Sequence, residues 1–306
     1  MATFFSSQNT DETQHYLSKL NELSHTFKAM DNARKNVFRV PHFNIEKDRY
    51  VIFSDVHKGN GQNITDDFSH NEMTYVAALD YYINRDYRLI LNGDIEECWK
   101  FEHDIIANVY ADTAFRAERQ FIEQGHGFYM RTYGNHDEVW ANPLKLKKGL
   151  HRILKFPIEV HPAISLGDKI LIAHGHQGDL TADRIATFTR HFIRRFWKPL
   201  QQLLHVKLDG KLAQNYSFEG QRERCLYRWA VANRQLLIAG HTHRAFFHPH
   251  ECVTSDHYIN LGSCIHNDGI TGVEIDRGEI RLVHWETGLR RNVFKRADLG
   301  SLLARL

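Results

Sequence analysis

The sequence predicts an α/β fold in which two packed sheets are flanked by helices. In the first half of the chain, short β-rich runs alternate with helical segments of ten or more residues, a pattern typical of parallel strand pairs. The last third is instead rich in strands that are separated by Asp-Gly and Arg-Gly turns. A chain of 306 residues is long enough to bury the core of such a fold.

The N-terminal segment, residues 1–48, is polar, and its apolar residues recur at helical spacing, so we expect a helical extension there. Residues 49–306 then form the main domain. Its first half should contain strands at 49–55, 88–94 and 127–135 and helices at 69–83 and roughly 104–124.

A basic helix is expected after Pro143, followed by two strands around the Gly167–Asp168 turn. Residues 180–234 have a helical pattern throughout and are expected to form a cap or insertion. A strand then returns in QLLIAGHTH, and the β-rich end contains HYINLGS, GVEIDR and EIRLVHW.

Composition and charge exclude several classes of protein. The net charge of +2 is too small to indicate a nucleic-acid binder. The four cysteines form no CxxC pair, which argues against a zinc knuckle or a disulfide scaffold. No apolar run approaches eighteen residues and no signal peptide is evident, so we expect a cytoplasmic protein without a transmembrane segment.

Five short motifs carry the functional argument, and each one follows a β-rich run. They are SDVHKGN, NGDIEE, YGNHDE, AHGH and GHTHR, in that order. The carboxyl ends of strands are where α/β sheets place their sites. Seven side chains in these motifs are candidate metal ligands: Asp55, His57, Asp94, Asn135, His174, His241 and His243.

This set of residue types suits the hydrolysis of a phosphate ester. Two metal ions about 3.5–4 Å apart can hold the phosphoryl oxygens and activate a water molecule as the nucleophile. In an extended segment, residues two apart point to the same side, so His241 and His243 can reach one cluster, as can Asp55 and His57. Ligation by Asp, Asn and His without thiolates favours Mn²⁺, Fe or Zn²⁺ over a soft-metal site but does not select among these three ions. We expect two divalent ions, with Mn²⁺ as the first candidate and Fe or Zn²⁺ as the alternatives.

The five motifs resemble, in order, the D-x-H, G-D, G-N-H-[DE], H and G-H-x-H motifs of the calcineurin-like metallophosphoesterase superfamily. The resemblance covers about residues 50–265 and implies a four-layer α-β-β-α sandwich of two mixed sheets, with the helical insertion over the site. It also implies that one metal is bound by Asp55, His57 and His243. The other metal would be bound by Asn135, His174 and His241, with Asp94 bridging the two.

The same resemblance implies a catalytic role for His136, as a general acid or a stabiliser of the transition state. Asp137 would orient its ring. Within the superfamily, NGDIEECW, HGHQGD and the helical insertion resemble the bacterial UDP-2,3-diacylglucosamine pyrophosphohydrolase group. That group usually has Arg at the position of His136 and HGD in place of HGH.

Candidate substrate contacts lie close to the fourth motif and in the insertion. They are His176, Asp179, Arg194 and Arg195. A hydrogen-bonding role beside His174 is the favoured alternative for His176, and Asp179 equally suits a solvated loop position. The predicted helix at 183–200 is basic and amphipathic. It could be a lid over an anionic lipid, a peripheral membrane contact or an ordinary cap helix.

The sequence therefore predicts a dinuclear metal-dependent phosphoesterase that acts on a small-molecule or lipid-linked phosphate ester or diphosphate through a metal-activated water. A phosphoprotein phosphatase or a nuclease of the same superfamily is the alternative enzyme. A nuclease would need a basic groove with stacking aromatic residues, for which the sequence carries no strong signal. The alternative from another class is a metal-binding interaction scaffold without catalytic turnover.

Overall fold

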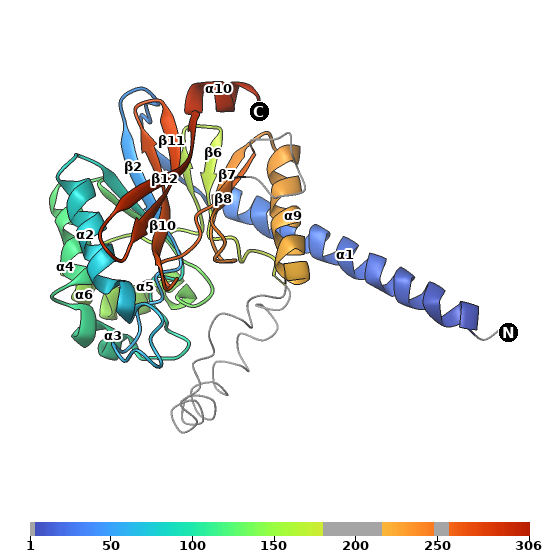
Figure 1. Cartoon of the computed structure of the whole chain (residues 1–306), viewed down its shortest axis with the longest axis horizontal. Helices are drawn as coiled ribbons and strands as arrows, with labels where there is room; N and C mark the ends of the chain where they lie inside the picture. The colour runs from blue at the N-terminus through green and yellow to red at the C-terminus, as the bar shows by residue number, and fades with distance from the viewer. Residues whose placement is uncertain (1–3, 180–215, 248–256) are drawn as a thin grey trace.

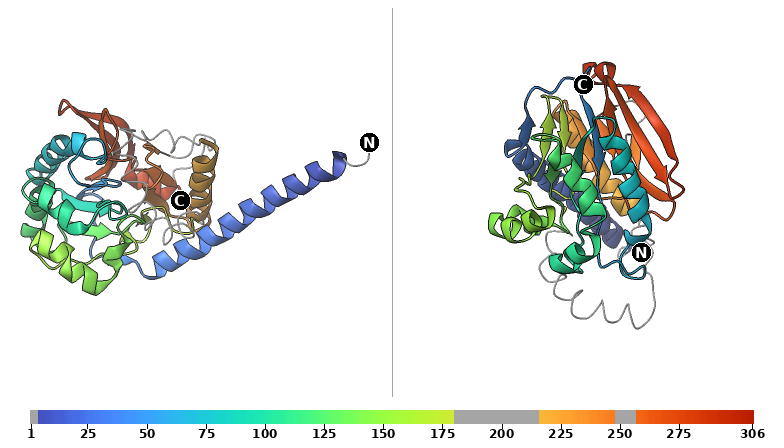
Figure 2. Two further views of the ribbon diagram at one scale, coloured as in Figure 1. Left: turned by 90° about the horizontal axis from the view of Figure 1, so that it is seen from below. Right: turned by 90° about the vertical axis from the view of Figure 1, so that its left-hand side faces the viewer.

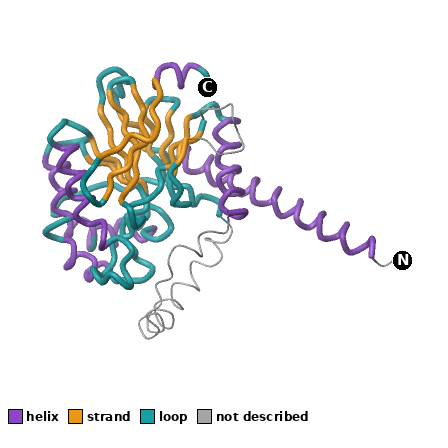
Figure 3. The backbone as a smooth tube through the Cα atoms, in the orientation of Figure 1, coloured by secondary structure: helices purple, strands orange, loops and turns teal. Residues whose placement is uncertain are grey.

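The computed structural model of the chain describes residues 4–179, 216–247 and 257–306. It contains two mixed sheets of six strands each, which pack face to face. Figure 1 shows the strands at the centre of the molecule, and Figure 3 separates them by colour from the helices that lie outside them. The predicted α/β class is thus confirmed.

The first sheet is built around three parallel strands and carries three of the five motifs. Its strand order is β12-β11-β10-β2-β3-β4, in which β2, β3 and β4 are parallel to one another and the remaining pairs are antiparallel. The strands are β2 (Arg49–Phe53), β3 (Arg88–Asn92), β4 (Tyr129–Thr132), β10 (Gly269–Asp276), β11 (Glu279–Glu286) and β12 (Arg291–Asp298).

The second sheet carries the other two motifs and has the order β1-β5-β6-β7-β9-β8. Strands β6, β7 and β9 are parallel, and so are β1 and β5, whereas β5–β6 and β8–β9 are antiparallel pairs. The strands are β1 (Phe38–Val40), β5 (Ile164–Leu166), β6 (Ile170–Ile172), β7 (Leu236–Ala239), β8 (Phe246–Phe247) and β9 (Tyr258–Asn260).

Helices cover the outer faces of both sheets. Two of them, α1 (Phe4–Lys35) and α9 (Tyr216–Ala232), pack against the second sheet. Figure 2 shows the N-terminal part of α1 extending away from the rest of the molecule. The first sheet is accompanied by α2 (Glu72–Ile83), α3 (His103–Tyr110), α4 (Ala114–Glu123), α5 (Pro143–Lys148) and α6 (Leu150–Leu154), and α10 (Leu299–Ala304) ends the chain. None of the described helices is long and apolar enough to cross a membrane.

Successive side chains along each strand point to opposite faces of its sheet, so each sheet buries apolar residues on both faces. The result is three apolar cores between four layers of secondary structure. Val51 and Phe53 of β2 face the helices, whereas Tyr50 and Ile52 face the second sheet. A third core lies between the second sheet and α1 with α9, where Trp229 is fully buried. The layers are therefore α-β-β-α, as the resemblance implied.

Several elements differ from the sequence expectations. The segment 1–48 contains β1 as well as a helix, and β1 pairs with β5, so the expected boundary at residue 48 separates a strand from its own sheet. The helix expected at roughly 104–124 is two helices, α3 and α4. The basic helix after Pro143 is interrupted at Gly149, where a Cβ would lie 2.5 Å from the Trp140 ring. Within the expected cap at 180–234, the described residues form α9, and residues 180–215 lie outside the described part of the chain.

Candidate metal centre

The five motifs meet at one end of the two sheets. Asp55 and His57 follow β2, Asp94 follows β3, and Asn135 follows β4 in the first sheet. In the second sheet, His174 follows β6, and His241 and His243 follow β7. Because the strands within each set are parallel, their carboxyl ends share an edge, and the face-to-face packing of the sheets brings the two edges together.

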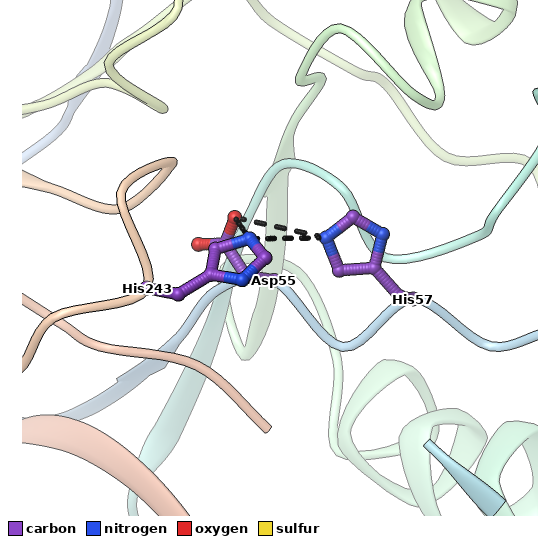
Figure 4. A group of neighbouring side chains, drawn as sticks. All are labelled: Asp55, His57 and His243. Carbon is purple, nitrogen blue, oxygen red and sulfur yellow. Dashed lines mark hydrogen bonds and ion pairs between the residues drawn. The ribbon is translucent and has the colours of Figure 1, made fainter. Parts of the chain in front are cut away.

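One group of candidate ligands consists of Asp55, His57 and His243, whose side chains point toward one another (Figure 4). The Nε2 atom of His243 lies 3.2 Å from Oδ1 of Asp55, and Nε2 of His57 lies 3.9 Å from the same oxygen. The two imidazole Nε2 atoms are 3.4 Å apart. These three donor atoms are close enough to bind one cation.

A second group consists of Asp94, His174 and His241. Oδ2 of Asp94 lies 3.1 Å from Nε2 of His174 and 3.9 Å from Nε2 of His57, which belongs to the first group. Nε2 of His174 in turn lies 3.9 Å from Oδ1 of Asp55. The two groups are therefore adjacent, and the Asp94 carboxylate lies between them.

Two buried polar atoms show that the site suits a cation. Oδ1 of Asn135 is buried without a hydrogen-bond partner among the described residues, although buried polar atoms are normally satisfied. Nδ1 of His174 donates to the carbonyl of Asn92 at 2.9 Å, which directs the buried Nε2 into the cluster, 3.1 Å from Oδ2 of Asp94. Oxygen and imidazole donors without a thiolate suit Mn²⁺, Fe or Zn²⁺.

The backbone at the site is held in an unfavourable conformation. Asp55, His57 and Asp94 each have φ of 53°, and His241 and His243 have φ of 71° and 58°. Residues with a Cβ avoid this left-handed region, which persists where the surrounding structure enforces it and is concentrated at functional sites. Here, the amide of Asp55 donates to the carbonyl of Gly93 at 3.1 Å, and that of His57 donates to the carbonyl of Asp94 at 2.9 Å.

Gly134 permits the close approach of the second and third motifs. A Cβ at this position would lie 2.2 Å from Oδ1 of Asp94 and 2.7 Å from its amide nitrogen. We expect Gly134→Ala to lower the free energy of unfolding by about 1–3 kcal/mol, because the Asp94 loop must move away. Metal retention should fall as well. Thermal unfolding and metal analysis test this, with Gly288→Ala as the control, since a Cβ at Gly288 meets nothing within 4 Å. Unchanged unfolding and metal content in Gly134→Ala would contradict the prediction.

Asp137 has a different role from the one expected. Its Oδ1 accepts hydrogen bonds from the amides of Gly134 at 2.7 Å and Asp94 at 3.2 Å, and its Oδ2 accepts from the amide of Ile95 at 2.9 Å. Arg131 completes this arrangement by donating to Oδ2 at 2.9 Å. The carboxylate thus joins the second and third motif loops through their main chains, and the contact to the His136 ring comes from another residue.

That residue is Glu97, which the sequence analysis did not single out. Its Oε1 lies 2.8 Å from Nδ1 of His136, and its Oε2 lies 3.2 Å from Nδ1 of His57. Burial alone would raise the pKa of Glu97, but the His136 ring and the Lys100 ammonium hold it well below its usual range. The two adjacent acidic residues in NGDIEE were the available signal, since a buried carboxylate needs a partner.

The surroundings of His136 favour its protonated form. Burial lowers the pKa of this imidazole, but the carboxylates of Glu97 and Asp94 outweigh burial and raise the pKa above its ordinary value. The amide of His136 also donates to Oδ1 of Asp94 at 2.7 Å. His136 is therefore tied to the candidate metal ligands through its main chain and to Glu97 through its ring.

Two of the four expected substrate contacts, His176 and Asp179, lie within the described residues. His176 is half-buried, and its ring centroid lies 5.3 Å from that of His174. Burial and the neighbouring His174 and His241 hold the pKa of His176 well below its usual range, so its ring is neutral at pH 7. Oδ2 of Asp179 lies 3.1 Å from Nε2 of His241. Arg194 and Arg195, like the rest of the predicted 183–200 helix, lie outside the described residues.

Metal binding should release a proton from His174. Burial favours the neutral ring, but the Asp94 and Asp55 carboxylates outweigh it and raise the pKa of His174 to about 10. A metal ligand must be neutral, so binding below this pKa displaces the Nε2 proton, and affinity should rise about tenfold per pH unit between about pH 6 and 8. Calorimetric titrations in buffers of different ionisation enthalpy measure the release. An affinity that is independent of pH would contradict the prediction.

The chain matches a known protein family and resembles solved structures of known proteins. A family model described as calcineurin-like phosphoesterase matches residues 48–245. Among solved structures, a conserved uncharacterized protein of Streptococcus pneumoniae TIGR4, described as a predicted phosphoesterase, is 14% identical with a TM-score of 0.33, and the match covers 81% of this chain and 97% of that one. A 5'-nucleotidase of Candida albicans SC5314 is 12% identical with a TM-score of 0.31, covering 88% of this chain and 54% of the nucleotidase. A search of curated proteins finds no match.

Proposed function

Since this chain belongs to the calcineurin-like phosphoesterase family and is a metal-dependent phosphoester hydrolase, we propose that it works with two adjacent divalent ions held by its five motifs. The observation that carries this proposal is the position of Asp94. Its Oδ2 lies 3.1 Å from His174 of one ligand group and 3.9 Å from His57 of the other. A carboxylate in that position can contribute to both ions.

The proposed ligands divide into two sets around Asp94. Asp55, His57 and His243 hold one ion, and the contacts among these three side chains support this assignment. Asn135, His174 and His241 hold the other, which is supported for Asn135 by its buried, unpartnered Oδ1. We propose Mn²⁺ as the native ion, with Fe and Zn²⁺ as the alternatives that the same donor set accommodates.

When bound, such ions supply Lewis acidity toward a phosphoryl oxygen and toward water. The residues of the chain supply the rest. Glu97 holds Nδ1 of His136, which leaves Nε2 as the ring atom that can donate a proton to an oxygen of the substrate. Asp137 keeps the loops of Asp94 and Gly134 together, so that the candidate ligands and His136 stay in one arrangement.

For the substrate, we propose a small or lipid-linked phosphate ester or diphosphate. The resemblance of NGDIEECW and HGHQGD to the group that cleaves a nucleotide-linked lipid diphosphate supports this choice. His176 and Asp179 lie beside the second ligand group and are the proposed contacts to the substrate among the described residues. Arg194 and Arg195 are proposed as further contacts from the insertion.

Metal-dependent hydrolysis of bis-p-nitrophenyl phosphate tests the proposal. Protein treated with a chelator should be inactive and should regain activity with Mn²⁺, Fe²⁺ or Zn²⁺. Elemental analysis of the reloaded protein should find two ions per chain. A panel of monoesters, diesters and nucleotide diphosphates then identifies the substrate class. A fully active protein that retains only one ion per chain would contradict the dinuclear site. A protein that hydrolyses none of these substrates with any metal would favour a non-catalytic scaffold.

A further inference from the structure

We propose that Trp99 is a positioning residue that holds the plane of the His136 imidazole, an inference that rests on the proposed function of His136. The indole of Trp99 stacks on this ring, with centroids 4.0 Å apart and planes inclined by 20°. Trp99 is not a candidate metal ligand and lies in the half-buried segment that follows the second motif. The stack on His136 places Trp99 directly beside the candidate site.

The two hydrogen bonds of His136 do not by themselves fix the plane of its ring. The hydrogen bond to Glu97 restrains Nδ1, and the main-chain bond to Asp94 restrains the amide nitrogen. The torsion that turns a histidine ring about its Cβ–Cγ bond is broad, so these two restraints allow the ring to tilt. A flat partner stacked against one face removes that freedom. The edge contact with the His57 ring, at 4.7 Å between centroids and 84° between planes, bounds the ring on another side.

Trp99 is well placed for this role because it shares a tight turn with Glu97. The amide of Cys98 donates to the carbonyl of Glu96 at 2.9 Å, and that of Phe101 donates to the carbonyl of Glu97 at 3.1 Å. The amide of Glu97 donates to the carbonyl of Lys58 at 3.0 Å, which joins the turn to the first motif loop. Cys98 and Phe101 are buried. One rigid turn thus supplies both the hydrogen bond and the stacking surface for His136.

The functional consequence concerns the position of Nε2. With Nδ1 held by Glu97, a tilt of the ring moves Nε2 by a large fraction of the ring width. A misplacement of about 1 Å in a reacting group can reduce a rate by about 100-fold. Loss of the stack should therefore lower kcat, while the metal ligands and the binding of substrate stay intact.

Kinetics of Trp99→Leu and Trp99→Phe in the metal-loaded protein test the inference. We expect Trp99→Leu to lower kcat by about 10- to 100-fold, with KM and metal content within about threefold of wild type. Trp99→Phe keeps an aromatic face and should recover activity to within about threefold of wild type. Tyr81→Leu is the matched control, because Tyr81 also packs against other rings but does so far from the site, against Tyr82 and Trp285.

A double-mutant comparison separates positioning from a general structural role. In a His136→Ala background, Trp99→Leu should change kcat by less than about threefold, because residues that act through one another do not have additive effects. A second measurement uses the metal-free protein, in which we expect the stacked imidazole of His136 to quench the fluorescence of the Trp99 indole. His136→Ala should change the tryptophan emission of the wild type but not that of Trp99→Phe.

Each outcome bears on the proposal. Losses of kcat that multiply in the double variant, or a rise in KM at unchanged kcat, would overturn it. Fluorescence that responds to His136→Ala equally with and without Trp99 would also overturn it. A wild type that hydrolyses no substrate with any metal would overturn the proposed function and this inference with it, whereas an active wild type with multiplicative losses overturns the inference alone.

Discussion

Replacing Asp94 with asparagine should abolish hydrolysis, with a fall in kcat/KM of about a thousandfold or more even at high metal concentration. The substitution keeps the shape of the side chain and its Oδ1 acceptor for the amide of His136. It removes the negative charge that lies between His174 and His57. Without that charge, two cations would be held close together with one carboxylate, Asp55, in place of two.

Metal content is the direct measurement for Asp94→Asn. Elemental analysis should find fewer than two ions per chain after loading, and circular dichroism should show that the metal-free variant keeps its secondary structure. Asp168→Asn is the control, because Asp168 is fully exposed in the turn between β5 and β6. Two retained ions with wild-type affinity would remove Asp94 from the bridging position.

The second large effect is expected for His136→Ala, which should lower kcat by about 10²- to 10⁴-fold, the usual contribution of a positioned acid or base. His136 lies in a third group of close donor atoms, with His57 and Glu97, but its Nδ1 is held by Oε1 of Glu97 at 2.8 Å, so we expect metal content to stay unchanged. His126→Ala, at an exposed histidine in a loop, is the control. Equal activity in wild type and His136→Ala would exclude His136 from the mechanism.

The leaving group of the substrate separates the two roles considered for His136. A general acid matters most when the leaving oxygen is strongly basic, as in an alkyl ester. It matters least for p-nitrophenolate, which leaves without a proton. If His136 is the acid, His136→Ala should lose far more activity on alkyl esters than on p-nitrophenyl esters. Equal losses on both would instead indicate that His136 stabilises charge on the phosphoryl oxygens.

Much of the fold was predictable from local pattern. The alternation of strands and helices gave the α/β class, and the layered cores follow from the alternation within strands such as β2. The segments that the sequence did not predict are strands that form through pairing with strands elsewhere in the chain. Strand β1 has three residues and exists through its pairing with β5, more than a hundred residues away. Strand β12 was not foreseen, because its side chains are mostly exposed and lack a clear alternation of polar and apolar residues.

The candidate ligands were identifiable because each lies within a few residues of the end of a β-rich run, which places it at a sheet edge wherever the strand lies in the fold. The extended backbone expected for the Asp-x-His and His-x-His pairs was wrong, because the ligands that follow β2 and β7 have positive φ, so the turns after these strands orient their side chains. The structure brings Asp55, His57 and His243 together, and Asp94, His174 and His241 beside them. Their assignment as ligands remains a proposal, which the metal content of the variants tests.

The partner of His136 was not a local property. The family resemblance implied Asp137, but its carboxylate turns inward, where the amides of Gly134, Asp94 and Ile95 are within reach. Glu97 lies 39 positions from His136 and meets it because β3 and β4 are neighbouring parallel strands whose loops leave the sheet side by side. The same pairing brings Trp99 onto the ring.

By itself, then, the sequence determined the class of the fold and the chemical types gathered at the strand ends, since both follow from periodicity and from residues within a few positions of one another. Only the tertiary structure decided which carboxylate holds which imidazole. The physical reason is that a buried charged group takes the donors that packing brings within about 3 Å, and these come from other strands rather than from its sequence neighbours.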